Sequence, residues 1–446
     1  MDRSAPPSAA PELAFRPPPF QRLRLDSGLE LVLASREGVP LVEVALLLPA
    51  GGELNPLARP GLSALTASLV DEGTRRRSGL ELATRLEQLG AALGARSDWD
   101  AARVEASALA DDLAELLAVV AEVAREPSFP EVEVERLRGQ TLAEILRLPD
   151  HPGRLADRAI AAALYPESPF GELLQGTEPA LRAVTRDEIV RFHAANYLPA
   201  GGHLVLCGAF DAAQAELLAR EAFDDWRPGA ARERPAPAAT TAAAGVTIVD
   251  LPRAPQTELR LAHVGVPRAH PDRTRLGVLN ALLGGKFTSR LNLNLRERHG
   301  YTYGVSSRFV DRRSAGPFVV ATSIATDAAG AAAGEVLAEL RRLRDEPVGE
   351  EELGETRSYL RGVFPYTFQT VSGYLARLTD LALFELPDDH FETALAAITT
   401  TRVDDVARLA RTHLRPEEMH IAAAGPATVL APQLARFGTV KVVCPA

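Results

Sequence analysis

Cysteine is nearly absent from this sequence, which contains only Cys207 and Cys444. A disulfide framework and a cysteine-based zinc or iron–sulfur site are therefore excluded. The chain also lacks an uninterrupted apolar run of about 18 residues, so we expect no transmembrane helix. Its first residues, MDRSAPPSAAPELAFRPPPF, lack the continuous apolar core of a secretory signal. We therefore expect a cytoplasmic protein, or a periplasmic one if a leader has been removed.

Basic residues are outnumbered by acidic ones. The sequence has 49 Lys and Arg residues against 59 Asp and Glu residues, which gives a formal net charge of −10. Nucleic acids and anionic membranes both favour basic surfaces. We therefore expect neither of them as a partner.

The common catalytic motifs are also missing. No two of the nine histidines lie four residues apart, so there is no HExxH or HxxEH zinc helix. The serine elbow G-x-S-x-G is absent, and the GGKF stretch at 284–287 has Asn280 and Phe287 where a phosphate-binding loop needs Gly and Ser or Thr. The single histidines at expected strand starts, His203 and His420, are interpreted as structural.

The length and composition are those of a multidomain globular protein. A chain of 446 residues with 46% hydrophobic and 24% charged residues fits two to four domains. The stretch RPGAARERPAPAATTAAAG, at 227–245, is rich in Pro, Ala and Thr and has no periodicity, so it predicts an exposed linker. We expect one domain over 15–227, a linker over 228–244 and a second domain over 245–446.

The two halves flanking this linker repeat one pattern. TRDEIVRFHAANYLPAGGHLVLCG in the first half and RVDDVARLARTHLRPEEMHIAAAG in the second each predict a capped helix, a Pro-marked turn and a strand that ends at Gly. The alternating segments ARVEASAL (102–109) and PFVVATSI (317–324) predict strands. We therefore expect an α+β protein of two homologous α/β halves, each a mixed sheet flanked by helices. At a constant offset of 217 the matched residues include Asp187 and Asp404, Pro199 and Pro416, and Gly208 and Gly425.

Two segments stand out in this repeat. GLSALTASLVDEGT, at 61–74, has apolar residues at helical spacing and predicts an amphipathic helix without an imidazole or a thiol. GGKFTSRLNLNLRERHGYTYGVSSRF, at 284–309, predicts a helix that Gly300 ends before a strand begins. There Arg296 and Tyr303 offer a guanidinium fork and a phenol, both donors to carbonyl oxygens. A surface arginine and a core tyrosine remain the alternative.

With these motifs the sequence resembles the M16 metallopeptidase family, the pitrilysin and mitochondrial-processing-peptidase group. The resemblance extends from about residue 20 to residue 443. It implies the LuxS/MPP-like metallohydrolase fold of homologous α/β domains. Its motifs are ARPGL…EGT (58–74), LEQLGA (86–91), FPEVEVER…EI (129–145), YLPAGGHLVLCG and GGKFTSRLN…LRERHGYTYGVSS.

The zinc motif of this family is degenerate here. Catalytic members carry HxxEH on the helix that corresponds to 61–74, and this chain has Ala64, Ala67 and Ser68 at those three positions. The third zinc ligand of the family, a Glu, corresponds to Glu144, 76 residues after Ser68. One carboxylate does not hold a catalytic zinc. The resemblance therefore implies no metal in this chain, with zinc in a partner subunit.

The substrate-binding motif of the family is intact. Its Arg and the Tyr seven residues later, which hold the substrate backbone, correspond to Arg296 and Tyr303. The resemblance thus implies a non-catalytic, substrate-binding subunit, inactive alone, that pairs with a zinc-bearing M16 homologue and acts on peptides or unfolded polypeptides. One alternative is a proteolytically inactive structural or assembly protein of the same fold, including a self-dimer. Another is an enzyme with an unrecognised site near His151 or His193.

Overall fold

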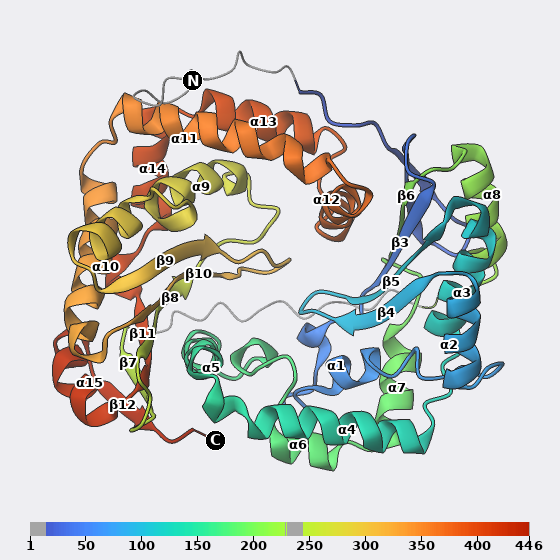
Figure 1. The fold of residues 1–446 in the computed structure, drawn as a ribbon, viewed down its shortest axis with the longest axis horizontal. Helices are drawn as coiled ribbons and strands as arrows, with labels where there is room; N and C mark the ends of the chain where they lie inside the picture. The colour runs from blue at the N-terminus through green and yellow to red at the C-terminus, as the bar shows by residue number, and fades with distance from the viewer. Residues whose placement is uncertain (1–14, 228, 230–243, 446) are drawn as a thin grey trace, which may run out of the picture.

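The computed structural model describes residues 15–227, 229 and 244–445, and it contains two mixed six-stranded sheets (Figure 1). Most of the expected linker, at 228 and 230–243, lies outside the described residues. The first sheet has the order β1-β2-β6-β3-β5-β4 and the second the order β12-β7-β11-β8-β10-β9. From the second position onward the two orders match strand for strand, so the predicted internal repeat and the mixed-sheet fold class are confirmed.

The first half contains both sheet strands and helices in alternation. Its strands are β1 (Gln21–Arg24), β2 (Glu30–Ser35), β3 (Leu41–Leu48), β4 (Ala92–Ser97), β5 (Ala102–Leu109) and β6 (His203–Gly208). Its helices are α1 (Leu62–Ala67), α2 (Gly79–Gln88), α3 (Leu113–Arg125), α4 (Glu131–Leu146), α5 (Pro152–Leu164), α6 (Glu178–Ala183), α7 (Arg186–Asn196) and α8 (Ala212–Phe223).

The second half repeats this arrangement and adds two π-helical segments. Its strands are β7 (Val246–Asp250), β8 (Thr257–Val264), β9 (Thr302–Phe309), β10 (Pro317–Ile324), β11 (His420–Gly425) and β12 (Val440–Val443). Its helices are α9 (Arg273–Asn280), α10 (Ala329–Asp345), α11 (Glu350–Val363), α12 (Val371–Leu383), α13 (His390–Thr400), α14 (Val403–His413) and α15 (Ala427–Leu434), with the π-helices η5 (Ala281–Gly285) and η6 (Asn292–Arg298) and the 3₁₀ helix η8 (Phe364–Phe368). No helix among the described residues is both long and apolar enough to cross a membrane.

The repeated unit begins with a helix whose first turn is capped by side chains close to it in sequence. Thr185 precedes α7 and forms a capping box with Glu188: its hydroxyl accepts from the Glu188 N–H at 3.2 Å, and the Glu188 carboxylate accepts from the Thr185 N–H at 2.9 Å. In the second half the Asp405 carboxylate accepts from the Arg402 N–H at 2.9 Å at the start of α14. The strands β6 and β11 that follow are central in their sheets, which explains their nearly continuous apolar sequences.

Each half covers one face of its own sheet and lends a helix to the other half. On β6, Leu204 and Leu206 face the first-half core, whereas Val205 and Cys207 face α12 of the second half. Helix α12 packs against β3 and β6, and α5 packs in the same way against β8 and β11 of the second sheet. The chain therefore buries both faces of its central strands only when the two halves are together.

Two tyrosines tie these exchanged helices to the half that they cover. The hydroxyl of Tyr374 on α12 donates to the Pro18 carbonyl at 2.6 Å, and that of Tyr165, just after α5, donates to the Ala315 carbonyl at 3.0 Å. Burial raises the pKa of Tyr165 to about 12 and raises the pKa of Tyr374 as well, so both phenols stay protonated donors.

An arginine of the β9–β10 loop is inserted into the first half at the same junction. Arg312 is 8% exposed, and its guanidinium carbon lies 5.0, 5.4 and 4.6 Å from the ring centroids of Trp99, Tyr165 and Phe170. Such cation–π contacts are strongest where water is excluded. The next residue, Arg313, donates its N–H to the buried carboxylate of Asp100 at 2.9 Å.

Leu378→Ala should destabilise the half of the chain to which Leu378 does not belong. Leu378 is fully buried on α12 in the cluster that covers the first sheet, and truncation of such a leucine typically costs about 2–5 kcal/mol. Both tryptophans, Trp99 and Trp226, lie in the first half. Their fluorescence in urea should therefore report a lower unfolding midpoint for the variant.

The matched control is Leu217→Ala, because that leucine is 68% exposed on α8 of the first half. It should leave the tryptophan transition where the wild type has it. An unchanged transition in Leu378→Ala would contradict the exchange of helices between the halves.

Candidate functional site

The helix at the degenerate zinc motif is shorter than the sequence predicts. Helix α1 follows Gly61, whose φ of 96° is left-handed, and ends at Ala67. The buried Asn55 amide oxygen accepts from the Ser63 N–H at 2.8 Å, which satisfies one donor at the helix start. After Ala67 the chain continues in turns held by hydrogen bonds of shorter sequence span. The prediction of a helix over all of 61–74 is therefore wrong beyond its first six helical residues.

The side chains at the four degenerate zinc positions do not form a ligand set. Ala64 and Ala67 offer no donor atom, and Ala67 is 1% exposed. The Ser68 hydroxyl donates to the Leu65 carbonyl at 3.0 Å and so completes the helix end. Glu144 is an exposed carboxylate near the end of α4. Because zinc in proteins is held by three or four strong ligands, these residues do not fit the ion.

A half-buried carboxyl group, that of Asp71, lies where the chain leaves α1. Burial raises the pKa of Asp71 to about 6, and the neighbouring Glu72 carboxylate acts in the same direction, while the Ala95 N–H of β4 opposes it. Burial and the Asp71 charge together raise the pKa of Tyr197 at the end of α7. Glu72 forms a 2.5 Å ion pair with Arg136 of α4, which ties α4 to the end of this segment.

The second predicted site is exposed on the second half. Tyr303 lies near the start of β9, the edge strand of the sheet, and is 93% exposed, which excludes a core tyrosine. Arg296 lies on η6, which packs against β9. The Arg296 guanidinium carbon is 4.2 Å from the centroid of the Phe287 ring, and its Nε is 3.4 Å from the Glu297 carboxylate. Both predicted residues therefore present polar groups at the surface of one segment.

A buried asparagine holds η6 against β9. The Asn292 side chain accepts from the Val305 N–H at 3.1 Å and donates to the Val305 carbonyl at 2.9 Å. It also donates to the Ser289 hydroxyl at 3.1 Å. The helix expected here is π-helical over its last seven residues, a wide turn that is often found at functional sites. Sequence analysis missed Asn292, and its only signal was an amide between the apolar residues of a helix.

One cluster of metal-binding side chain types occurs among the described residues, and it is a polar network. His270, Asp272 and His413 converge between α9 and α14. Arg408 donates to both Asp272 oxygens at 2.9 and 3.0 Å, and His413 lies 3.2 Å from one of them, which holds the Asp272 pKa at about 2. His270 Nδ1 accepts from the Asp272 N–H at 3.1 Å, so the proton of the neutral ring is on Nε2. Nε2 then has no lone pair for a metal.

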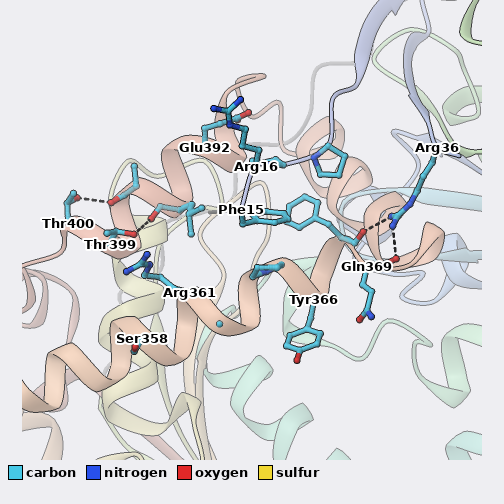
Figure 2. A pocket seen from close by; sticks show the side chains of 17 residues that line it. Phe15, Arg16, Arg36, Ser358, Arg361, Tyr366, Gln369, Glu392, Thr399 and Thr400 are labelled. Carbon is cyan, nitrogen blue, oxygen red and sulfur yellow. Dashed lines mark hydrogen bonds between the residues drawn. The ribbon is translucent and has the colours of Figure 1, made fainter. Parts of the chain in front are cut away.

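Two pockets lie away from Arg296 and Tyr303. One, of about 820 Å³, runs along β4 and β5 against α12. The other, of about 1450 Å³, lies between α11, η8, α13 and residues 15–18. Figure 2 shows Phe15 at its centre and Arg36 reaching the backbone near Gln369. Arg36 donates to the Gln369 carbonyl at 2.7 Å and so ties the end of η8 to the first half. Residues 1–14, outside the described part, directly precede Phe15.

Family models match most of the described chain. The model described as insulinase (peptidase family M16) matches residues 31–178, and the model described as the peptidase M16 inactive domain matches residues 183–360. Together with these matches, the two repeated mixed sheets place the chain in the class of M16-fold proteins. The chain belongs to the M16 peptidase family.

Individual relatives agree with this assignment. An uncharacterized zinc protease of Streptomyces coelicolor is 26% identical over 407 residues, 88% of this chain and 86% of the relative. The mitochondrial-processing peptidase subunit beta of Rattus norvegicus is 26% identical over 66% of this chain and 60% of its own length. A solved structure of a peptidase M16 inactive domain from Pseudomonas fluorescens is 25% identical and superposes with a TM-score of 0.86 over 91% of this chain and 98% of that one.

The free energy of unfolding of the wild type should decrease as the pH rises toward neutral, and Asp71→Asn should make this decrease smaller. The Asp71 pKa is about 6 in the folded chain against 3.8 for an ordinary aspartate, so its contribution is complete below about pH 4 and is lost as the pH rises through about 6. The shift corresponds to about 3 kcal/mol at most. Urea unfolding at a series of pH values should show a smaller decline for the variant.

Glu221→Gln is the control, because it removes an exposed carboxylate of the same half. Its pH dependence should follow the wild type. Equal pH slopes in Asp71→Asn and the wild type would show that partial burial does not raise the Asp71 pKa.

The chain purified alone should carry no stoichiometric zinc and should not hydrolyse unstructured peptides, because its donor set is incomplete. Elemental analysis measures the zinc content. Ala64→His, Ala67→Glu and Ser68→His together should give measurable zinc uptake with Glu144 as a further ligand, and Glu144→Ala in that background should weaken it. About one zinc per wild-type chain, lost together with activity on chelation, would reject this interpretation.

Proposed function

We propose that this chain is the non-catalytic, substrate-binding subunit of a two-chain M16 zinc peptidase. The observation that carries the proposal is a contrast between the two halves. Ala64, Ala67 and Ser68 leave α1 without zinc ligands, whereas Arg296 and Tyr303 remain and lie at the surface. The partner is a zinc-bearing M16 homologue, and the substrates are peptides or unfolded polypeptides.

The retained side chains are suited to hold a polypeptide backbone. A guanidinium presents a planar fork of donors, and a phenol adds one more, so both groups match carbonyl oxygens. A substrate held on this chain would be oriented toward the zinc of the partner chain. Such orientation accounts for a large share of many enzymatic rate enhancements. The partner would supply the zinc, and this chain would supply binding and orientation.

The printed names of the relatives support a peptidase context. The Streptomyces relative is named a zinc protease, and the rat relative is named a subunit, which is a protein that acts with another chain. We further propose a cytoplasmic complex, with the periplasm as the alternative; the absence of a disulfide between Cys207 and Cys444 is compatible with a reducing compartment.

Co-purification tests the partnership. The tagged full-length chain, isolated from the cells that produce it, should bring down a zinc-containing M16 homologue in stoichiometric amount, together with peptidase activity that a chelator abolishes. Recovery of the chain as a self-dimer without such activity would favour an inactive structural or assembly protein instead.

Arg296→Ala and Tyr303→Phe should each lower the peptidase activity of the reconstituted complex. Loss of one hydrogen-bond donor at a reacting centre costs roughly 2–4 kcal/mol, or about 30-fold to several-hundred-fold in rate. Phe keeps the ring of Tyr303, so that variant isolates the hydroxyl. Arg296→Lys should not restore activity, because an ammonium lacks the planar fork.

Size-exclusion chromatography should show that both variants still form the complex. Arg298→Ala is the matched control, because Arg298 is an exposed arginine two residues away on the same π-helix. Full activity of Arg296→Ala and Tyr303→Phe in an intact complex would contradict the role of these residues.

A further inference from the structure

We infer that Phe287 is a positioning residue for Arg296. This inference rests on the proposed function, because it concerns how the guanidinium of Arg296 is presented to a polypeptide. Phe287 belongs to the GGKF stretch, which lacks the residues of a phosphate-binding loop. The ring is 68% exposed, an unusual position for a large aromatic side chain.

The ring lies on a loop that cannot shift easily. Gly284 is buried, and a Cβ on it would come within 2.5 Å of the Ser307 hydroxyl, while one on the exposed Gly285 would come within 2.6 Å of the Asn280 side-chain amide nitrogen. Lys286, directly before Phe287, donates to the Thr356 hydroxyl of α11 at 2.8 Å. The chain before Phe287 is therefore anchored to β9 and α11, and the Ser289 N–H closes the turn by donating to the Lys286 carbonyl at 3.1 Å.

The guanidinium of Arg296 stacks on an aromatic ring and lies near one carboxylate. Its carbon lies 4.2 Å from the Phe287 ring centroid, a distance at which the ring face attracts a cation. Its Nε lies 3.4 Å from the Glu297 carboxylate. The Phe287 ring covers one face of the planar group, which leaves the opposite face and the terminal nitrogens for a ligand.

A free arginine side chain has many rotamers, and ordering it reduces affinity. Stacking on Phe287 restricts these rotamers before a ligand arrives, so less conformational entropy is lost on binding. The aromatic ring is thus the part of Phe287 that matters for this role. A tyrosine at the position would retain the ring, whereas a leucine would retain only apolar bulk.

The experiment measures binding of fluorescein-labelled β-casein, an unfolded polypeptide, to the full-length chain by fluorescence anisotropy. Phe287→Leu should weaken binding about two- to fivefold, the range expected for an exposed cation–π contact. Phe287→Tyr should bind as the wild type does. Phe287→Leu in the Arg296→Ala background should cause no further loss, because a positioning residue has no effect once its target is absent.

Three results would overturn the inference, and they separate it from the proposed function. If Arg296→Ala weakens binding and Phe287→Leu does not, Phe287 has no positioning role and the proposed function stands. If the two losses are additive, or if Phe287→Tyr fails to preserve binding, Phe287 contacts the polypeptide itself or serves the loop. If Arg296→Ala binds as the wild type does, the substrate-binding role of Arg296 is wrong and the inference falls with it.

Discussion

The fold depends on a reciprocal exchange in which each half covers one sheet face of the other. Helix α12 buries Val205 and Cys207 of the first sheet, and α5 buries Ala262 and Ala422 of the second. Apolar burial contributes roughly 25 cal/mol per Å², and both faces would be exposed to water if the halves separated. Arg312 closes the same junction from the β9–β10 loop by inserting its guanidinium among three aromatic rings of the first half. Figure 1 shows α12 of the second half beside β3 and β6, and α5 of the first half beside β11, so the two halves are joined through these helices.

This exchange also fixes the two regions on which the functional argument rests. Helix α1 belongs to the first half and η6 with β9 to the second, so packing at the junction sets their relative position. Within each region the local supports differ. Asn55 and Asp71 flank a short helix without ligands, whereas Asn292 and Phe287 support the guanidinium and the edge strand. The contacts around Arg296 lie on the side of the chain for which we propose polypeptide binding.

Much of the fold could be predicted from local sequence because its signals are local. ARVEASAL and PFVVATSI form β5 and β10 with the predicted bounds, since alternation marks a strand directly. The exchange of α5 and α12 could not be predicted, because an apolar helix face does not specify which sheet it covers. The stacking of Arg312 among aromatic rings of the first half and the His270–Asp272–His413 network could not be predicted either, because both join residues far apart in sequence. The π-helical turn of η6 depends on Asn292 bonding to β9, a tertiary contact without a periodic signature.

The central claim is that this chain contributes binding and orientation to an active site completed by a zinc-bearing homologue. Its most direct test is a titration of the purified chain into a fixed amount of that homologue, with peptidase activity on an unfolded polypeptide as the readout. The account predicts that activity rises from a low level and saturates at one chain per homologue. A homologue that is fully active alone, and whose activity does not change as this chain is added, would contradict it.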